Sequence, residues 1–187
     1  RVYPVFEQPD LKARWRFVVI APDGWQVLSN GAEAAREPVE GGVRVAFAET
    51  LPLSSYITAV AAGPYRRVEG VWHGPAGPVP LGVLCRASLA PPLVDSGDAD
   101  EILGITQRGL DFFSDAFGLV YPWGKYDQIF VPEYNLGAME NPGLVTFTER
   151  YVFRGAATVA QHEGRANTIL HEMAHMWFGD LATMRWW

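Results

Sequence analysis

The sequence predicts an α+β protein in which an all-β part comes first and a part of mixed α and β follows. Short aromatic and β-branched runs separated by turn residues fill the first half of the chain, which is typical of strands. Apolar residues at spacings of three, four and seven, which indicate amphipathic helices, are found after residue 97. We therefore predict an N-terminal β-rich domain at residues 1–88 and a mixed domain at residues 89–187.

The composition indicates a folded chain, and it argues against a membrane span and against nucleic-acid binding. Of the 187 residues, 49% are hydrophobic and 19% are charged, which is enough apolar material for a sizeable core. No run approaches the roughly 18 apolar residues that a membrane span needs. The net charge is −6 and Lys and Arg form no cluster, whereas binding to phosphates needs concentrated positive charge. We expect no membrane span and no nucleic-acid partner.

The first part of the chain contains a series of predicted strands. Residues 14–20 and 25–28 form two of them, and Pro22-Asp23-Gly24 between them suits a tight turn, so a hairpin is expected. In residues 43–47, apolar side chains alternate with small or polar ones, the period of a half-buried strand. Further strands are predicted at 56–61 and 79–87.

The second part begins with a break in the strand pattern. Pro91 and Pro92 favour an extended connection, and the polar residues that follow can cap a helix. Residues 98–117 then have helical periodicity, and Gly118 occupies the position of a C-terminal capping glycine. After that the pattern predicts strands at 126–131 and 143–148 and a long helix at 158–179.

Cysteine usage bears on the compartment. Cys85 is the single cysteine, so it cannot form an intrachain disulfide, and we expect it to be a small buried apolar residue. This favours a reducing compartment and predicts a cytoplasmic protein. The first residue is Arg1 and no signal-peptide pattern follows it, so we expect the natural start to lie upstream, which leaves an upstream secretory signal open.

The predicted C-terminal helix carries the pattern HExxH. His171 and His175 are four residues apart and project from one helix face, so both imidazoles can reach one zinc ion, and Glu172 lies beside them. The alternative is a helix with two unrelated histidines, but random placement would give the pattern in roughly 0.005 of such chains. His73 and His162 lack a partner at ligand spacing and are interpreted as ordinary histidines.

A zinc site needs a third protein ligand, and its position separates the classes of zinc peptidase. The extended pattern HExxHxxGxxH is excluded because Phe178 and Leu181 stand where its glycine and third histidine would be. Between His175 and the end of the chain, the single carboxylate is Asp180. It lies five residues after His175 and therefore off the ligand face, which leaves only a supporting role around the site open.

A second motif lies upstream of the helix, in a predicted loop. It consists of Gly137, Ala138, Met139, Glu140 and Asn141. GAMEN followed by HExxHxWxG resembles the aminopeptidase N family of zinc metallopeptidases, the gluzincins that carry both motifs. The residues at 5–13, 121–127 and 136–147 are also similar to that family, so the resemblance covers essentially the whole chain.

The resemblance implies a zinc metallo-aminopeptidase with a thermolysin-like mixed α/β catalytic domain after the β-rich domain. It implies that His171 and His175 bind one zinc ion and that Glu172 is the general base assisting attack by a zinc-bound water. It further implies that Glu140 receives the free α-ammonium of a peptide substrate. The remaining substrate-binding positions that it implies are Gly137, Ala138, Met139 and Asn141. Peptides with a free N-terminus are the expected partners.

The resemblance also implies groups that lie outside the chain. The family's third ligand is a glutamate 19 positions after the second histidine, which would be position 194, and its oxyanion-stabilising tyrosine lies further on. We therefore expect a truncated fragment that binds zinc weakly and is inactive alone. Two alternatives stay open: a zinc endopeptidase in which Glu140 is an ordinary loop acid, and a non-catalytic scaffold that has lost the metal.

Overall fold

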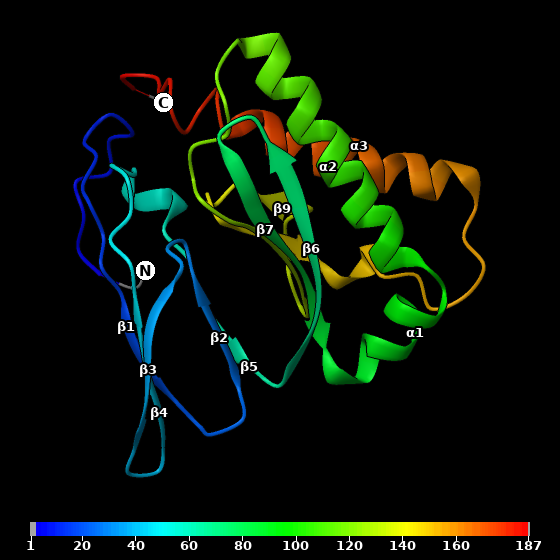
Figure 1. Cartoon of the computed structure of the whole chain (residues 1–187), viewed down its shortest axis with the longest axis horizontal. Helices are drawn as coiled ribbons and strands as arrows, with labels where there is room; N and C mark the ends of the chain where they lie inside the picture. The colour runs from blue at the N-terminus through cyan, green and yellow to red at the C-terminus, as the bar shows by residue number, and fades with distance from the viewer. Residues whose placement is uncertain (1–2, 187) are drawn as a thin grey trace.

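The computed structural model describes residues 3–186. Figure 1 shows the N-terminal strands on one side and a second sheet, covered by long helices, on the other. This arrangement confirms the predicted α+β class, with a β-rich part followed by a mixed part. The principal elements are β1 Val18–Ala21, β2 Gln26–Ser29, β3 Glu33–Val39, β4 Gly42–Phe47, β5 Val60–Gly63, β6 Tyr65–Gly74, β7 Gly77–Arg86, α1 Ala90–Asp95, α2 Asp98–Phe117, β8 Tyr126–Val131, β9 Ala138–Met139, β10 Leu144–Thr148 and α3 Val159–His175.

The N-terminal strands form two small sheets, in the orders β1-β4-β3 and β2-β5. The predicted strand at 43–47 is confirmed as β4, in which half-buried and buried residues alternate. The predicted hairpin between the first two strands is wrong, because β1 pairs with β4 while β2 pairs with β5. The turn at Pro22-Asp23-Gly24 does reverse the chain locally, but a turn does not choose the partner of the strand that follows it.

The second sheet has five strands in the order β6-β7-β8-β10-β9. β6, which the sequence analysis missed, pairs antiparallel with β7, and β7 then runs parallel to β8. Residues 65–86 therefore share a sheet with the strands of the second part. The division at 88/89 stays a prediction, and this pairing favours an earlier boundary, near Pro64.

The segment between β7 and α2 contains a short helix, α1. The expectation of an extended segment at Pro91 and Pro92 is wrong, because both residues lie in α1 with proline in its first turn. The first turn of a helix has no intrahelical partner for its N–H groups, so proline is tolerated there. The next predicted helix is confirmed: α2 spans Asp98–Phe117 and ends at Gly118, whose φ of 63° is left-handed.

The two long helices, α2 and α3, pack together beside the five-stranded sheet (Figure 1). Gly109 of α2 allows the close approach, because a Cβ there would lie 2.7 Å from both Leu170 Cδ2 and Met173 Sδ of α3. Met173 stands inside the HExxH motif and is fully buried. The core between the helices and the sheet thus buries one face of the motif helix, α3. The opposite face is left open for a ligand.

The single cysteine lies in the core. Cys85 is a free, fully buried cysteine of β7, as expected for a small apolar residue. Within residues 3–186, no helix has both the length and the apolar character needed to cross a bilayer.

Candidate active site

Helix α3 begins with a complete capping box. The Thr158 side chain accepts from the backbone N–H of Gln161 at 3.3 Å, and the backbone N–H of Thr158 donates to the Gln161 side chain at 2.8 Å. The helix ends at His175, four residues before the predicted end. Gly179, whose φ is 138°, lies instead in a tight turn in which the Asp180 N–H donates to the His175 carbonyl at 2.9 Å.

The two motif histidines have the spacing that one zinc ion requires. His171 Nε2 and His175 Nε2 are 3.3 Å apart. Two nitrogens that each lie about 2.0–2.1 Å from a tetrahedral zinc ion are about 3.3–3.4 Å from each other. The donor set therefore fits the metal that the motif implies, and the predicted pairing of these two histidines on one helix face is seen in the structure.

The turn after α3 sets the orientation of His175. Its Nδ1 lies 3.3 Å from the carbonyl oxygen of Phe178, which is an acceptor only. The proton of a neutral imidazole therefore belongs on Nδ1, and the lone pair of Nε2 faces His171. A ligating histidine is commonly fixed by a hydrogen bond of this kind at its second nitrogen.

Glu172 lies next to the histidines but is buried, with 6% of its surface exposed. This burial, with a smaller effect from the negative charge of Glu140, raises the pKa of Glu172 to about 7. One oxygen of Glu172, one oxygen of Glu140 and one nitrogen of His175 all lie within 4.8 Å of one another. The structure thus brings together the two motifs, which are far apart in the sequence.

The GAMEN residues form an edge of the five-stranded sheet. Ala138 and Met139 make up β9, the last strand in the order, and pair antiparallel with Phe147 and Thr146 of β10. The carbonyl of Gly137 extends this pairing by accepting from Thr148 N–H at 3.0 Å. Because β9 lies at the edge of the sheet, its outer side is the place where an extended peptide could add as a further strand.

Glu140 follows β9 directly, half-buried, and has a partner that the sequence analysis missed. The Tyr56 side chain lies close to the Glu140 carboxylate. Burial of Tyr56, together with the negative charges of Asp180 and Glu140, raises the pKa of the tyrosine. Tyr56 comes from the 3-10 helix Ser55–Ile57 of the N-terminal part, and no local sequence signal connects it to a loop more than eighty residues away.

Asn141 occupies a different environment from Glu140. Its side chain is buried and its Nδ2 donates to Thr146 Oγ1 at 3.2 Å. The next carbonyl, that of Pro142, accepts from Asn30 Nδ2 at 2.9 Å. These bonds hold the turn between β9 and β10, while the predicted role of Asn141 in substrate binding stays a prediction.

Asp180 is the most deeply buried carboxylate near the motif helix, with no exposed surface. Neither of its carboxyl oxygens has a hydrogen-bond partner among residues 3–186. Burial is the main cause that raises its pKa to about 9; the charges of Glu140 and Glu172 also raise it, and Lys12 lowers it. Asp180 is not among the side chains whose ligand atoms gather around His175, and its supporting role stays a prediction.

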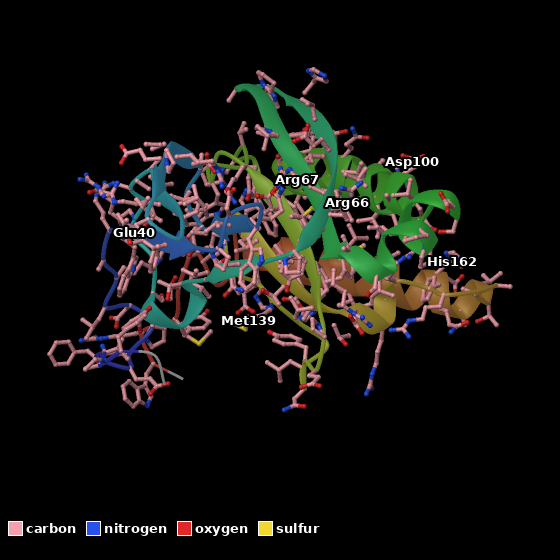
Figure 2. All side chains as sticks on the ribbon, turned by 90° about the horizontal axis from the view of Figure 1, so that it is seen from below. Glu40, Arg66, Arg67, Asp100, Met139 and His162 are labelled. Carbon is pink, nitrogen blue, oxygen red and sulfur yellow. The ribbon has the colours of Figure 1, made fainter. Side chains whose placement is uncertain are left out.

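A second group of acidic and histidine side chains lies toward the other end of α3 and consists of Asp98, Glu101 and His162. The guanidinium of Arg165 already occupies its centre, 2.8 Å from Asp98 and 2.7 Å from Glu101. His162 Nδ1 is 2.8 Å from Glu101, so this histidine is a member of an ion-pair cluster, as expected for an ordinary histidine. Figure 2 shows His162 well apart from Met139 of the GAMEN strand.

The fold and the site together define an HExxH helix packed beside a sheet whose edge strand presents a glutamate. Two family models match the chain: the Peptidase M1 N-terminal domain at residues 1–57 and the Peptidase family M1 domain at residues 101–187. The chain therefore belongs to the peptidase M1 family.

Several curated proteins are similar to the chain over nearly all of its length. Aminopeptidase N of Streptomyces lividans is 52% identical over 187 residues, which is 100% of this chain and 21% of that protein. Aminopeptidase N of Mus musculus is 33% identical over 190 residues, covering 99% of this chain and 19% of that protein. Aminopeptidase M1-B of Oryza sativa subsp. japonica is 30% identical over 191 residues, 100% of this chain and 21% of that protein. The chain thus spans about a fifth of the length of these relatives.

Proposed function

We propose that this chain carries the metal-binding helix and the amine-recognition strand of a zinc-dependent aminopeptidase, which hydrolyses the N-terminal residue from peptides. The main support for the proposal is that ligand atoms of Glu140, Glu172 and His175 lie within 4.8 Å of one another. In addition, the Nε2 atoms of His171 and His175 have the separation that two ligands of one zinc ion require. The similarity to proteins named aminopeptidase supports the same conclusion.

His171 and His175 would hold the zinc ion through their Nε2 atoms, with a further ligand supplied from outside these two side chains. When bound, zinc supplies Lewis acidity, which polarises a peptide carbonyl and acidifies water. The protein presents two imidazoles on one face of α3, and the opposite face of this helix packs against the core. The bond from His175 to the Phe178 carbonyl keeps one of them in the required tautomer.

Glu172 would act as the general base. Its carboxylate takes a proton from the attacking water and gives it to the nitrogen of the leaving peptide. A general base works best when its pKa is near the working pH, and burial has moved the pKa of Glu172 toward that range. A bound cation nearby favours the ionised form of Glu172, so the carboxylate is the form that accepts the proton.

Glu140 would determine which bond is cleaved. A carboxylate at a fixed position pairs with the free α-ammonium of a peptide and thereby places the first peptide bond, rather than a later one, at the metal. The edge of β9 would hold the following residues in an extended conformation by backbone hydrogen bonds. This division of roles distinguishes an aminopeptidase from an endopeptidase with the same helix.

Metal removal tests the proposal. We expect the full-length protein, dialysed against a strong chelator, to lose its hydrolysis of a short peptide with a free N-terminus, and one equivalent of zinc to restore it. Zinc content is measured by mass spectrometry before and after, and a magnesium addition serves as the control because imidazole ligands favour zinc over magnesium. Full activity in the zinc-free protein would contradict the proposal.

A further inference from the structure

Lys12 reaches from the N-terminal segment to the turn that follows the motif helix. Its Nζ donates to the carbonyl of Asp180 at 2.6 Å and to the carbonyl of Leu181 at 3.2 Å. In Figure 1, a blue loop of the N-terminal segment lies near the red C-terminal segment. One ammonium group thus ties together two segments that are distant in the sequence.

The turn that Lys12 holds is the one that orients His175. Phe178, whose carbonyl lies 3.3 Å from His175 Nδ1, forms an isolated β-bridge with Ala182. Gly179 N–H donates to the Ala182 carbonyl at 3.0 Å, and Asp180 N–H donates to the His175 carbonyl at 2.9 Å. Carbonyls inside this turn are thus the acceptors for Lys12, so the lysine acts on the same backbone that fixes the imidazole.

Lys12 is itself held in place by its own segment. The neighbouring Ala13 pairs with Leu53 through two backbone hydrogen bonds of 3.0 and 2.8 Å, and the Pro9 carbonyl accepts from the Ser54 hydroxyl. The backbone N–H of Lys12 donates to the Asp10 carbonyl at 3.0 Å. The ammonium therefore projects from a backbone attached to the N-terminal part, rather than from a loose end.

The positive charge of Lys12 also acts on a buried acid near the proposed metal site, Asp180. The Asp180 carboxylate is fully buried beside two further acids, Glu140 and Glu172, and Lys12 is the cation that favours its ionised form. Burial lowers the pKa of Lys12, and Asp180 raises it. The ammonium of Lys12 therefore acts against the effect of burial on the pKa of Asp180, in addition to donating hydrogen bonds.

We propose that Lys12 is a positioning residue of the zinc site, which holds the turn 178–182 and through it the orientation of His175. The inference rests on the proposed function, since it takes His175 to be a zinc ligand. Groups that hydrogen-bond directly to metal ligands typically change metal affinity or activity by about 10–100-fold when they are removed. Lys12 acts one step further away, through the turn, so the lower end of this range, about 10-fold, is expected. Lys12 thus gives the N-terminal part a direct role in the metal site of the following part.

The test compares Lys12→Met with Arg16→Met in the full-length protein. Methionine keeps an unbranched apolar stem and removes the donors and the charge. Arg16 belongs to the same N-terminal segment but pairs with the exposed Glu49, 3.3 Å away, so it is a matched control for loss of one cation. The zinc dissociation constant of each metal-free protein is measured by competition with a coloured chelator, and the melting temperature of the metal-free proteins is recorded alongside.

We expect K12M to bind zinc about 10-fold or more weakly than R16M, and Lys12→Arg, which restores a cationic donor, to recover most of the affinity. A purely structural role would lower the melting temperature of metal-free K12M and leave zinc binding unchanged. Zinc affinities of K12M and R16M within about twofold of each other would overturn the inference, since 10-fold is the smallest effect expected.

A second variant covers the case in which K12M does not fold. Lys12→Gln is then measured against R16M with the same criterion: equal zinc affinity overturns the inference, and weaker binding supports it. Failure of the wild-type protein to bind zinc would instead overturn the proposed function together with this inference. Tight binding by both the wild type and the lysine variants would overturn this inference alone.

Discussion

Replacing Glu172 by Gln is expected to lower kcat of the full-length protein by about 10²–10⁴-fold, the usual contribution of a general base. Glutamine has nearly the same shape but cannot accept a proton from water. Because Glu172 is buried and the substitution removes a charge from that environment, the fold should be retained. Zinc binding should also be retained, since His171 and His175 are unchanged. Steady-state kinetics and zinc content of the purified variant check both statements.

The matched control for this prediction is Glu163→Gln. Glu163 is an exposed glutamate on the same helix, α3, so the control makes the same chemical change without touching the site. We expect its kcat to equal that of the wild type. If Glu172→Gln kept more than about a tenth of the wild-type kcat, a loss below the range for a general base, another group would have to be the base.

Replacing Glu140 by Gln is expected to lower kcat/KM for peptides with a free N-terminus by about 100-fold. The loss corresponds to about 3 kcal/mol, within the 2–5 kcal/mol typical for removing one partner of a buried, hydrogen-bonded charge pair. Glutamine has nearly the same shape as glutamate and still offers an oxygen acceptor, so the loop should keep its position. The missing interaction is then the ion pair with the substrate ammonium, and kinetics with a dipeptide-like amide substrate measure it.

Glu133→Gln provides the control for the amine-recognition prediction. Glu133 is exposed and lies in the loop that leads to β9, so its substitution tests a general charge effect in this region. We expect no more than a twofold change for it, since a solvent-exposed charge contributes little. A Glu140→Gln variant that behaves like Glu133→Gln would remove the ground for assigning Glu140 to the substrate amine.

Local sequence signals were sufficient for α2, for most of α3 and for both motifs, but not for the short helix α1. Helix α3 begins after Thr158, where the pattern predicted its start, and Gly118 ends α2 where the pattern placed its cap. The i,i+4 spacing of His171 and His175 needs only helix geometry to bring their Nε2 atoms to 3.3 Å. These features depend on residues close together in the chain, and so the sequence alone could predict them.

Features that depend on distant partners could not be predicted in the same way. The pairing of β1 with β4 rather than β2, and of β7 with β8, depends on which surfaces pack together. The contacts from Tyr56 to Glu140 and from Lys12 to the turn after α3 join segments that are far apart in the chain. The sequence around a lysine or a tyrosine contains no local pattern that predicts such a partner.

Under the proposed function, the full-length protein removes residues one at a time from a free N-terminus. The most direct measurement incubates the full-length protein with one peptide in two forms, with a free or an acetylated N-terminus, and follows the products by mass spectrometry. We predict successive loss of single N-terminal residues from the free form and an intact acetylated form. Cleavage of both forms at equal rates, or at internal bonds, would contradict the claim and favour a zinc endopeptidase.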